Sequence, residues 1–229
     1  MLSSLSIVIP AYNEEPNLRI AVEDIVSVLP KVAAAYEIII VNDGSQDTTG
    51  LIAEELARQY SFIRVIHHFQ NIGFGGGIRT GLKEARSEYV MFIPADRQFS
   101  PQDILNYLPY TNEADIVLGI RLRRKDPLLR KINTIALRVA MFLLFRITLR
   151  DINWVKLFRR SFICDIPLSS KGIGIDAELI VKAKRRGARF REVPVGYFAR
   201  MAGQATSCRP KAIVDALIEL VKLRLGVLG

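Results

Sequence analysis

The sequence predicts an α/β protein with a doubly wound, mostly parallel sheet that carries helices on both faces. Two observations favour this class. Leu5–Pro10 and Glu37–Asn42 are short, β-branched and apolar throughout, as is typical of buried parallel strands. Between them, the apolar residues of Leu18–Leu29 recur at helical spacing after the start signal Asn13-Glu14-Glu15-Pro16. Strands that alternate with helices in this way indicate a Rossmann-like parallel sheet.

The same unit repeats along the first half of the chain. We expect helices over Thr48–Tyr60 and Gly76–Ala85, strands over Ile63–His67 and Tyr89–Pro94, and a strand over Asp115–Leu118 after a helix that begins at Pro101. In such sheets, ligands bind beyond the carboxyl ends of the strands. The residues that follow the strands are therefore candidates for a binding site.

Acids and amides follow three of the predicted strands. These strand ends read Pro10-Ala11-Tyr12-Asn13-Glu14, Asn42-Asp43-Gly44-Ser45 and Pro94-Ala95-Asp96-Arg97-Gln98. Because the strand bodies are apolar, this pattern indicates a polar ligand site built on an apolar sheet. Asp43-Gly44-Ser45 could equally be a helix-capping turn.

A glycine-rich stretch, Asn71–Gly81, follows the third predicted strand. It lacks the Lys-Ser/Thr of a P-loop, and no G-x-G-x-x-G follows the first strand, which argues against a nicotinamide cofactor. We expect its glycines to let the backbone approach a ligand and to start a helix that packs closely on the sheet.

Charge is divided unevenly between the two halves of the chain. Residues 1–117 carry 8 Lys and Arg against 15 Asp and Glu, whereas residues 118–229 carry 24 against 8, within a formal net charge of +9. A basic second half favours an anionic partner: nucleic acid, a membrane surface or a phosphate-bearing substrate. Nucleic acid is disfavoured because the basic tracts lack interleaved aromatic residues for base stacking. Cys164 and Cys208 fit no metal-ligand spacing and are expected to be reduced thiols of a cytosolic protein.

The order of motifs resembles the nucleotide-sugar glycosyltransferases of family two, which are inverting enzymes with the GT-A fold. The motifs are IVIPAYNEEPNL, IIIVNDGSQDTT, NIGFGGGIRTGL, PADRQFSP and DIVLGIR. In the second half, DINWVKLFRR, Gly172–Leu179, REVPV and the Tyr197-x-x-Arg200-x-x-Gly203 pattern resemble the branch of dolichol-phosphate mannose synthase and bacterial polyprenyl-phosphate sugar transferases. The match spans about residues 5–206.

The resemblance implies a site for a nucleotide-sugar donor and a divalent cation. It assigns donor binding to Pro10, Ala11, Tyr12, Glu14, Asn42, Asp43 and Asp96. Asp96 and Gln98 match the last two ligands of the family's Asp-x-Asp-x-Gln motif, so Mg²⁺ or Mn²⁺ is expected there, although Pro94 replaces the first Asp. Asn42 replaces the first acid of the usual Asp-Asp pair, so the base, guanine or uracil, stays open.

The resemblance also implies an acceptor that carries a phosphate. Arg121, Arg130, Thr134 and Arg200 match the residues that surround the acceptor phosphate, and Asp96 with these arginines forms the expected catalytic set. Guanidinium groups suit phosphate oxygens. An ionised polyprenyl phosphate can attack the sugar without a general base and invert the anomeric centre. A sugar-hydroxyl acceptor would instead require a carboxylate, for which Asp176 and Glu178 are the candidates; we favour an orienting or structural role for both.

A polyprenyl phosphate acceptor implies contact with a membrane. Neither a signal peptide nor a membrane anchor is expected, and Arg138 and Arg146 argue against a spanning helix over Ile132–Leu149. That helix instead places Lys131 and both arginines on one side, and apolar residues on another: Ile132, Ile135, Ala136, Val139, Phe142 and Leu143. A second candidate over Ala212–Leu225 presents Ile213, Leu217, Leu220 and Leu223 or Leu225. Both helices could equally pack on the core or on a partner subunit.

These expectations amount to one catalytic domain and one appended helix. The domain covers 1–210, with a nucleotide-sugar half at 1–117 and an acceptor half at 118–210 that includes an amphipathic helix near 128–149; a C-terminal amphipathic helix covers 211–229. The protein is expected to be cytoplasmic and peripheral at the cytoplasmic face of a membrane, with or without a membrane-protein partner. Two alternatives stay open: a soluble family-two transferase with a hydroxyl acceptor, and a non-catalytic membrane-binding homologue.

Overall fold

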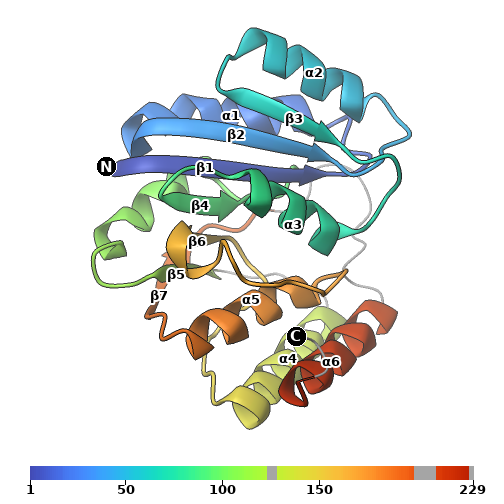
Figure 1. Ribbon diagram of the computed structural model, residues 1–229, viewed down its shortest axis with the longest axis vertical. Helices are drawn as coiled ribbons and strands as arrows, with labels where there is room; N and C mark the ends of the chain where they lie inside the picture. Colours follow the sequence, from blue (N-terminus) through green and yellow to red (C-terminus); the bar gives the residue numbers. More distant parts are fainter. Residues whose placement is uncertain (123–127, 199–209, 227–229) are drawn as a thin grey trace.

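The computed structural model describes residues 1–122, 128–198 and 210–226, and the side chains of 128–133 and 210–213 lie outside this description. Its core is a seven-stranded sheet in the order β3-β2-β1-β4-β6-β5-β7 (Figure 1). The strands are β1 (Leu2–Ala11), β2 (Ala33–Asn42), β3 (Ile63–His67), β4 (Tyr89–Phe92), β5 (Ile116–Arg121), β6 (Lys156–Arg159) and β7 (Phe190–Val195). All neighbours pair in parallel except β6, which is antiparallel to both β4 and β5.

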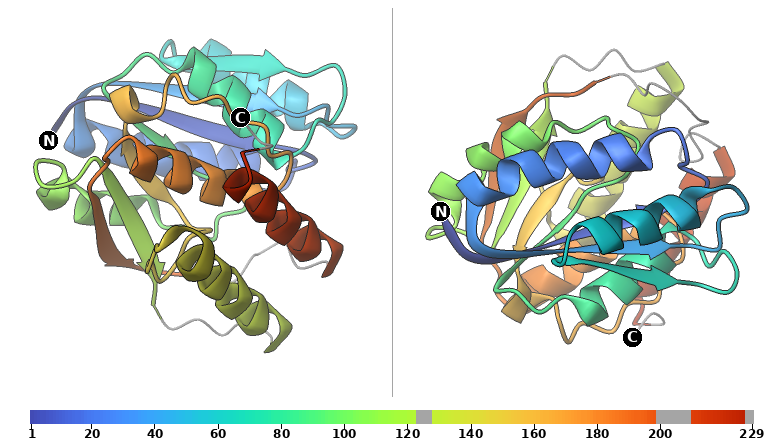
Figure 2. Two further views of the ribbon diagram at one scale, coloured as in Figure 1. Left: turned by 60° about the horizontal axis from the view of Figure 1, so that its bottom comes forward. Right: turned by 90° about the horizontal axis from the view of Figure 1, so that it is seen from above.

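Helices cover both faces of the sheet, which confirms the predicted fold class. They are α1 (Leu18–Val32), α2 (Thr49–Gln59), α3 (Phe74–Glu84), α4 (Leu128–Phe145), α5 (Gly174–Arg185) and α6 (Pro210–Arg224), with 3₁₀ turns η1 (Pro101–Asn106), η2 (Leu108–Tyr110) and η3 (Arg160–Phe162). One buried apolar cluster joins α1 and α2 to the sheet, and a second joins α3, α5 and α6 to its other face. Figure 2 shows α1 and α3 on these opposite faces.

Several predicted boundaries were wrong. β2 begins at Ala33, directly after α1, and the predicted helix at Pro101 is the 3₁₀ turn η1. Strand β6, helix α5 and strand β7 were not predicted as elements. Since β6 is antiparallel, the sheet is parallel only outside this strand.

Helix α4 ends earlier than the sequence pattern suggests. Arg146 has φ 56°, so it leaves the helix in the left-handed region, and the N–H of Ile147 donates to the carbonyl of Met141. The N–H of Arg146 donates to the carbonyl of Phe142 (2.9 Å), which makes this an αL helix end, and the buried Ile147 and Met141 both belong to the second core cluster. Arg146 therefore lies beyond the end of the helix. The prediction that it lies on the polar face of this helix was wrong.

The two amphipathic helices lie side by side at one end of the molecule (Figures 1 and 2). Helix α6 packs on α4 and α5, and its Leu220 and Leu223 are buried in the second core cluster. The apolar face predicted to meet a membrane is therefore largely internal in α6. In α4 the predicted face is exposed at Ile135, Val139, Phe142 and Leu143. Among the described residues, no helix is long and apolar enough to cross a bilayer.

Close packing of α3 on the sheet depends on Gly81. A methyl group at this position would lie 2.1 Å from Cγ1 of Val8 in β1. We predict that Gly81→Ala lowers the free energy of unfolding by roughly 1–3 kcal/mol, because overpacking a rigid interface outweighs the gain in helix propensity. Urea denaturation of the variant measures this loss. Gly172→Ala, where a methyl group would meet nothing within 4 Å, is the matched control; equal stability of the two variants would contradict the prediction.

Candidate functional site

Six strand ends meet at one edge of the sheet, where the predicted site residues lie. All strands except β6 point toward this edge, because β6 is the one reversed strand of the sheet. Their last residues are Ala11, Asn42, His67, Phe92, Arg121 and Val195. The loops that carry the predicted donor, metal and acceptor groups therefore start from a common edge, at the right of Figure 1.

Asp43 ties the end of β2 to the glycine-rich loop. Its buried carboxylate accepts the backbone N–H groups of Ile72 (3.0 Å) and Gly73 (2.9 Å) and lies 2.7 Å from Nδ1 of His68. The other ring nitrogen of His68 lies 2.8 Å from Oγ1 of Thr80 in α3. An acid expected to contact the nucleotide thus also fixes the loop that leads into α3. His68 was not singled out from the sequence.

The first two loops hold each other through polar contacts. The N–H of Asn13 donates to Oγ of Ser45, and the side chain of Asn13 accepts the N–H of Gln46. Glu14 donates its N–H to Oγ1 of Thr49. Tyr12 is 41% exposed, whereas Ala11 and Asn42 are buried. The predicted donor residues are therefore held together in space, with Tyr12 the most accessible of these three.

Asn42 and Pro10 serve the packing of neighbouring elements. The side chain of Asn42 lies 2.9 Å from Nδ1 of His67 and accepts the N–H of Ser45. A methyl group on Gly77 would lie 3.1 Å from Cβ of Pro10, so the start of α3 lies directly against the end of β1. This close approach confirms the expected tight packing of the glycine-rich helix on the sheet.

Asp96 and Gln98 lie on a turn after β4. The carboxylate of Asp96 accepts the N–H of Gln98 (3.2 Å), and Arg97 between them adopts φ 59°. Left-handed backbone is uncommon for residues other than glycine, and it marks a turn whose shape is imposed by its surroundings. The amide nitrogen of Gln98 donates to Oη of Tyr197 (3.1 Å) and to the carbonyl of Phe198 (3.4 Å).

This turn offers oxygen ligands that fit a hard cation. Because the Gln98 nitrogen makes these two hydrogen bonds, its Oε1 is the amide atom left to face a metal beside the Asp96 carboxylate. Mg²⁺ commonly takes one or two carboxylates and completes its shell with water and substrate phosphates. Within the described ranges, no cluster of three or more His, Cys, Asp or Glu could hold a metal without such help.

Arg121, at the end of β5, belongs to a buried ion pair. Its Nε and Nη2 donate to the two carboxylate oxygens of Asp151, each at 2.7 Å, and both side chains are 3% exposed. The guanidinium carbon lies 4.6 Å from the ring centre of Trp154 and 5.5 Å from that of Tyr197. A bidentate pair between aromatic rings holds Arg121 in one orientation and leaves Nη1 as its remaining nitrogen.

A second buried pair lies next to the first. Nζ of Lys156 donates to the Trp154 carbonyl (2.7 Å) and to Oδ1 of Asp176 (2.6 Å), and the Lys156 side chain is 1% exposed. Burial raises the pKa of Asp176, while the Lys156 cation opposes part of that shift. Asp176 is therefore paired with the buried Lys156, which agrees with the orienting or structural role expected for this acid.

Glu178 holds the segment that precedes α5. Its carboxylate accepts the N–H groups of Ser169 and Ser170 and lies 2.9 Å from Nζ of Lys182. Burial acts to raise the pKa of Glu178, but the Ser170 amide and the Lys182 cation lower it below its ordinary value. Glu178 is therefore an ionised structural group, with its oxygens bound to the backbone.

The predicted acceptor set is only partly described. Arg121 is placed as above, and Thr134 lies half-buried in α4. The side chain of Arg130 and the whole of Arg200 lie outside the described residues. Asp151 and Lys156 complete the buried network and were missed, although both occur in the quoted motif DINWVKLFRR. A charged residue inside the apolar run around Lys156 was the available signal.

Removing the Asp151 charge should destabilise the fold strongly. We predict that Asp151→Asn costs roughly 3–5 kcal/mol of unfolding free energy, because the Arg121 cation would stay buried without its counter-ion. Chemical denaturation monitored by circular dichroism measures the change. Glu113→Gln, which breaks the exposed pair with Arg191, should cost less than about 1 kcal/mol. Similar losses in the two variants would contradict the assigned role.

Comparison with known proteins identifies relatives of the chain. The family model described as "Glycosyl transferase family 2" matches residues 6–164. Dolichyl-phosphate beta-glucosyltransferase ALG5A of Trichomonas vaginalis is 30% identical over 210 residues, covering 83% of this chain and 64% of that protein. Undecaprenyl-phosphate 4-deoxy-4-formamido-L-arabinose transferase of Pectobacterium atrosepticum is 32% identical over 133 residues, covering 57% of this chain and 41% of that protein. The chain therefore spans less than two thirds of the length of these relatives.

Solved structures support the fold. Glucosyl-3-phosphoglycerate synthase from Mycobacterium tuberculosis, in complex with phosphoglyceric acid, has a TM-score of 0.74 at 20% identity and covers 98% of this chain and 80% of that one. The same enzyme in complex with Mn²⁺, UDP and glucosyl-3-phosphoglycerate has a TM-score of 0.70 at 21% identity, with the same coverage. These likenesses confirm the predicted GT-A fold. The family match over residues 6–164 shows that the chain belongs to glycosyl transferase family 2.

Proposed function

We propose that the protein transfers a sugar from a nucleotide-sugar donor to a polyprenyl phosphate. The observation that carries this proposal is the common sheet edge, where Asp96 and Gln98 follow β4 and Arg121 ends β5, which points the same way on the other side of β6. The relatives support the acceptor class, since their names specify dolichyl or undecaprenyl phosphate.

The donor is a UDP- or GDP-linked sugar held by the first two loops. Pro10, Ala11, Tyr12 and Glu14 come from the end of β1, and Asn42 and Asp43 from the end of β2. The exposed ring of Tyr12 suits stacking on a base, whereas buried Asp43 acts partly through the glycine-rich loop that it holds. These loops set the preference for one base, and the transfer assay below compares UDP- and GDP-sugars.

Asp96 and Gln98 hold a divalent cation, Mg²⁺ or Mn²⁺, on the donor diphosphate. Such an ion would neutralise charge that develops on the departing nucleoside diphosphate. The role of the protein is to aim the two oxygens of this turn, through the Asp96 bond to the Gln98 backbone and the Gln98 bond to Tyr197. Pro94 replaces an expected acid, so substrate phosphates and water would have to supply the other ligands of a bound ion.

The acceptor phosphate needs no general base, because it is already ionised at neutral pH. Arg121, Arg130, Thr134 and Arg200 surround it in this proposal, with Nη1 of Arg121 as the donor that Asp151 leaves for the phosphate. In-line attack then inverts the anomeric centre. Engagement of Asp176 by Lys156 and of Glu178 by backbone amides disfavours a hydroxyl acceptor, which would require one of these acids as a base.

The exposed apolar faces of α4 and α6 bring the enzyme to its lipid substrate. Ile135, Val139, Phe142 and Leu143 are exposed on α4, and the adjacent α6 exposes a row of its own at Val214, Ile218, Val221 and Leu225. Paired helices with such faces suit insertion into the headgroup region, with basic groups such as Arg138 near anionic lipids. We place the protein at the cytoplasmic face of a membrane as a peripheral enzyme. The alternative is that a membrane-protein partner, and not the lipid, covers the exposed faces of α4 and α6.

Sugar transfer should depend on Asp96. Purified protein is incubated with Mg²⁺ or Mn²⁺, labelled UDP- and GDP-sugars and a short polyprenyl phosphate, and lipid-linked sugar is measured. We expect transfer with one donor class, and a loss of at least 100-fold in Asp96→Asn, since its leaving-group metal is held less well. Glu113→Gln, which removes an exposed acid paired with Arg191, serves as the control. Unchanged transfer in Asp96→Asn would contradict the metal assignment, and no transfer with any donor would contradict the proposed reaction.

Membrane binding should depend on the exposed face of α4. We predict that Phe142→Ser combined with Leu143→Ser reduces the fraction that sediments with anionic liposomes at least tenfold, because each buried apolar side chain contributes about 1.5–3 kcal/mol. Leu51→Ser on α2, at the opposite end of the molecule in Figure 1, is the control and removes a similarly exposed leucine. Equal sedimentation of the double variant and the wild type would exclude this face.

A further inference from the structure

A separate cavity lies on the sheet face that α3 and α5 cover. Its volume is about 330 Å³, and it opens between α3 and the segment that runs from η3 toward α5. None of the residues assigned above to the donor, the metal or the acceptor lines it. It is therefore distinct from the proposed catalytic edge.

Three cationic side chains converge on this cavity. Arg79 and Lys83 are four residues apart on α3 and so share one helix face, and Arg160 comes from η3 on the opposite wall. Asp165 is the acid in the lining, but no ion pair within 4 Å joins it to these cations in the described part of the chain. The lining thus carries an excess of two positive charges.

Arg160, which lines this wall, also carries a buried donor without a partner within the described ranges. Its Nε is buried and has no hydrogen-bond partner among the described residues. Buried donors are nearly always paired, and an unpaired one often marks the place of a bound ion or water. Leu82 and Ile166 line the cavity as well, and apolar walls strengthen the attraction between a guanidinium group and an anion.

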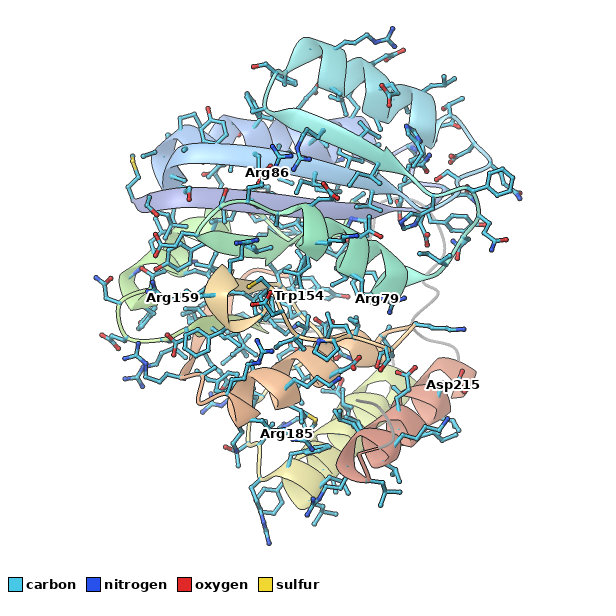
Figure 3. The ribbon with its side chains drawn as sticks, in the orientation of Figure 1. Arg79, Arg86, Trp154, Arg159, Arg185 and Asp215 are labelled. Carbon is cyan, nitrogen blue, oxygen red and sulfur yellow. The ribbon has the colours of Figure 1, made fainter. Side chains whose placement is uncertain are left out.

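Arg79 connects the cavity to the glycine-rich loop. Its Nη1 donates to the carbonyl of Ser170 (2.5 Å), and its side chain points from α3 toward the segment before α5 (Figure 3). The next carbonyl, of Lys171, accepts the N–H of Gly75 (2.9 Å) at the start of α3. A ligand in the cavity would therefore contact the same short segment that braces the glycine-rich loop.

We infer that this cavity is a binding site for a small soluble ligand that carries a phosphate group. Lys83 and Arg160 supply the main contacts, because ammonium and guanidinium groups both bind phosphate oxygens through charge-assisted hydrogen bonds. Arg79 is partly committed to Ser170 and shapes the wall between the cavity and the loop. The inference goes beyond the proposed transferase activity and does not depend on it.

Cys164 provides a reporter inside the cavity. The thiol lines the wall beside Asp165, to which it donates a hydrogen bond of 3.3 Å. Burial and Asp165 raise its pKa, and the nearby Arg160 cation acts in the opposite direction. A bound anion would cover this thiol and slow its alkylation, which makes occupancy of the cavity measurable without any assay of sugar transfer.

The experiment follows alkylation of Cys164 by iodoacetamide in the full chain with Cys208→Ser, which leaves one thiol. Inorganic pyrophosphate is the probe, in EDTA to keep metal from the catalytic edge, with sodium chloride at equal ionic strength as the salt control. We expect pyrophosphate to slow alkylation severalfold. Half-protection should require about tenfold more pyrophosphate in Lys83→Gln and in Arg160→Gln, since each removes one charge-assisted contact.

Arg58→Gln on α2 is the matched control and should leave protection unchanged. Lys83 is exposed, so Lys83→Gln tests the site even if Arg160→Gln lowers stability. Alkylation that pyrophosphate does not slow, or protection that is equal in the wild type and both variants, would overturn the inference. Protection by vesicles of phosphatidic acid but not by free pyrophosphate would also overturn it, because the ligand would then be a lipid.

Discussion

The buried ion pair between Arg121 and Asp151 is the interaction on which the second half of the molecule depends. It joins the end of β5 to the segment that leads into β6, and both side chains are 3% exposed. A charge at this depth is tolerated only with a well-placed partner. The two segments therefore cannot separate without leaving a buried charge unpaired, and β6 is kept antiparallel between β4 and β5. That reversal lets Arg121 end a strand at the same edge as the donor loops.

Three acids of the second half are engaged in the structure, and this shapes the chemistry of the site. Asp151 binds Arg121, Asp176 binds Lys156, and Glu178 binds the backbone before α5. Tyr197 extends the network to the metal turn, since it accepts from Gln98 and lies over Arg121. The edge thus presents fixed cations and the oxygens of the Asp96–Gln98 turn, with these three carboxylates already bound. Such an arrangement favours an acceptor that brings its own negative charge.

The first half of the fold could be predicted from the sequence because its signals are local. Apolar strands and amphipathic helices alternate there, and acids and amides mark the strand ends. The second half could not, because its order depends on contacts distant in the sequence. Strand β6 begins with Lys156, which reads as a surface residue until its partner Asp176 is placed beside it. In α6 the sequence pattern showed an apolar face but not which element covers it. Helix α5 packs on α6, and Leu220 and Leu223 of α6 are buried in the second core cluster. Likewise, Asp43 and His68 meet only once β2 and β3 pair.

The most direct test of the account compares two acceptors that differ by one group. Purified protein, metal and the active labelled donor are incubated with a polyprenyl phosphate and with the corresponding polyprenol, and initial rates of lipid-linked sugar formation are measured. We predict transfer to the phosphate and none to the alcohol. Asp151, Asp176 and Glu178 are engaged by other groups and are therefore not available as a base for a hydroxyl. Comparable transfer to the alcohol would contradict the base-free mechanism and the assignment of the cationic edge to an acceptor phosphate.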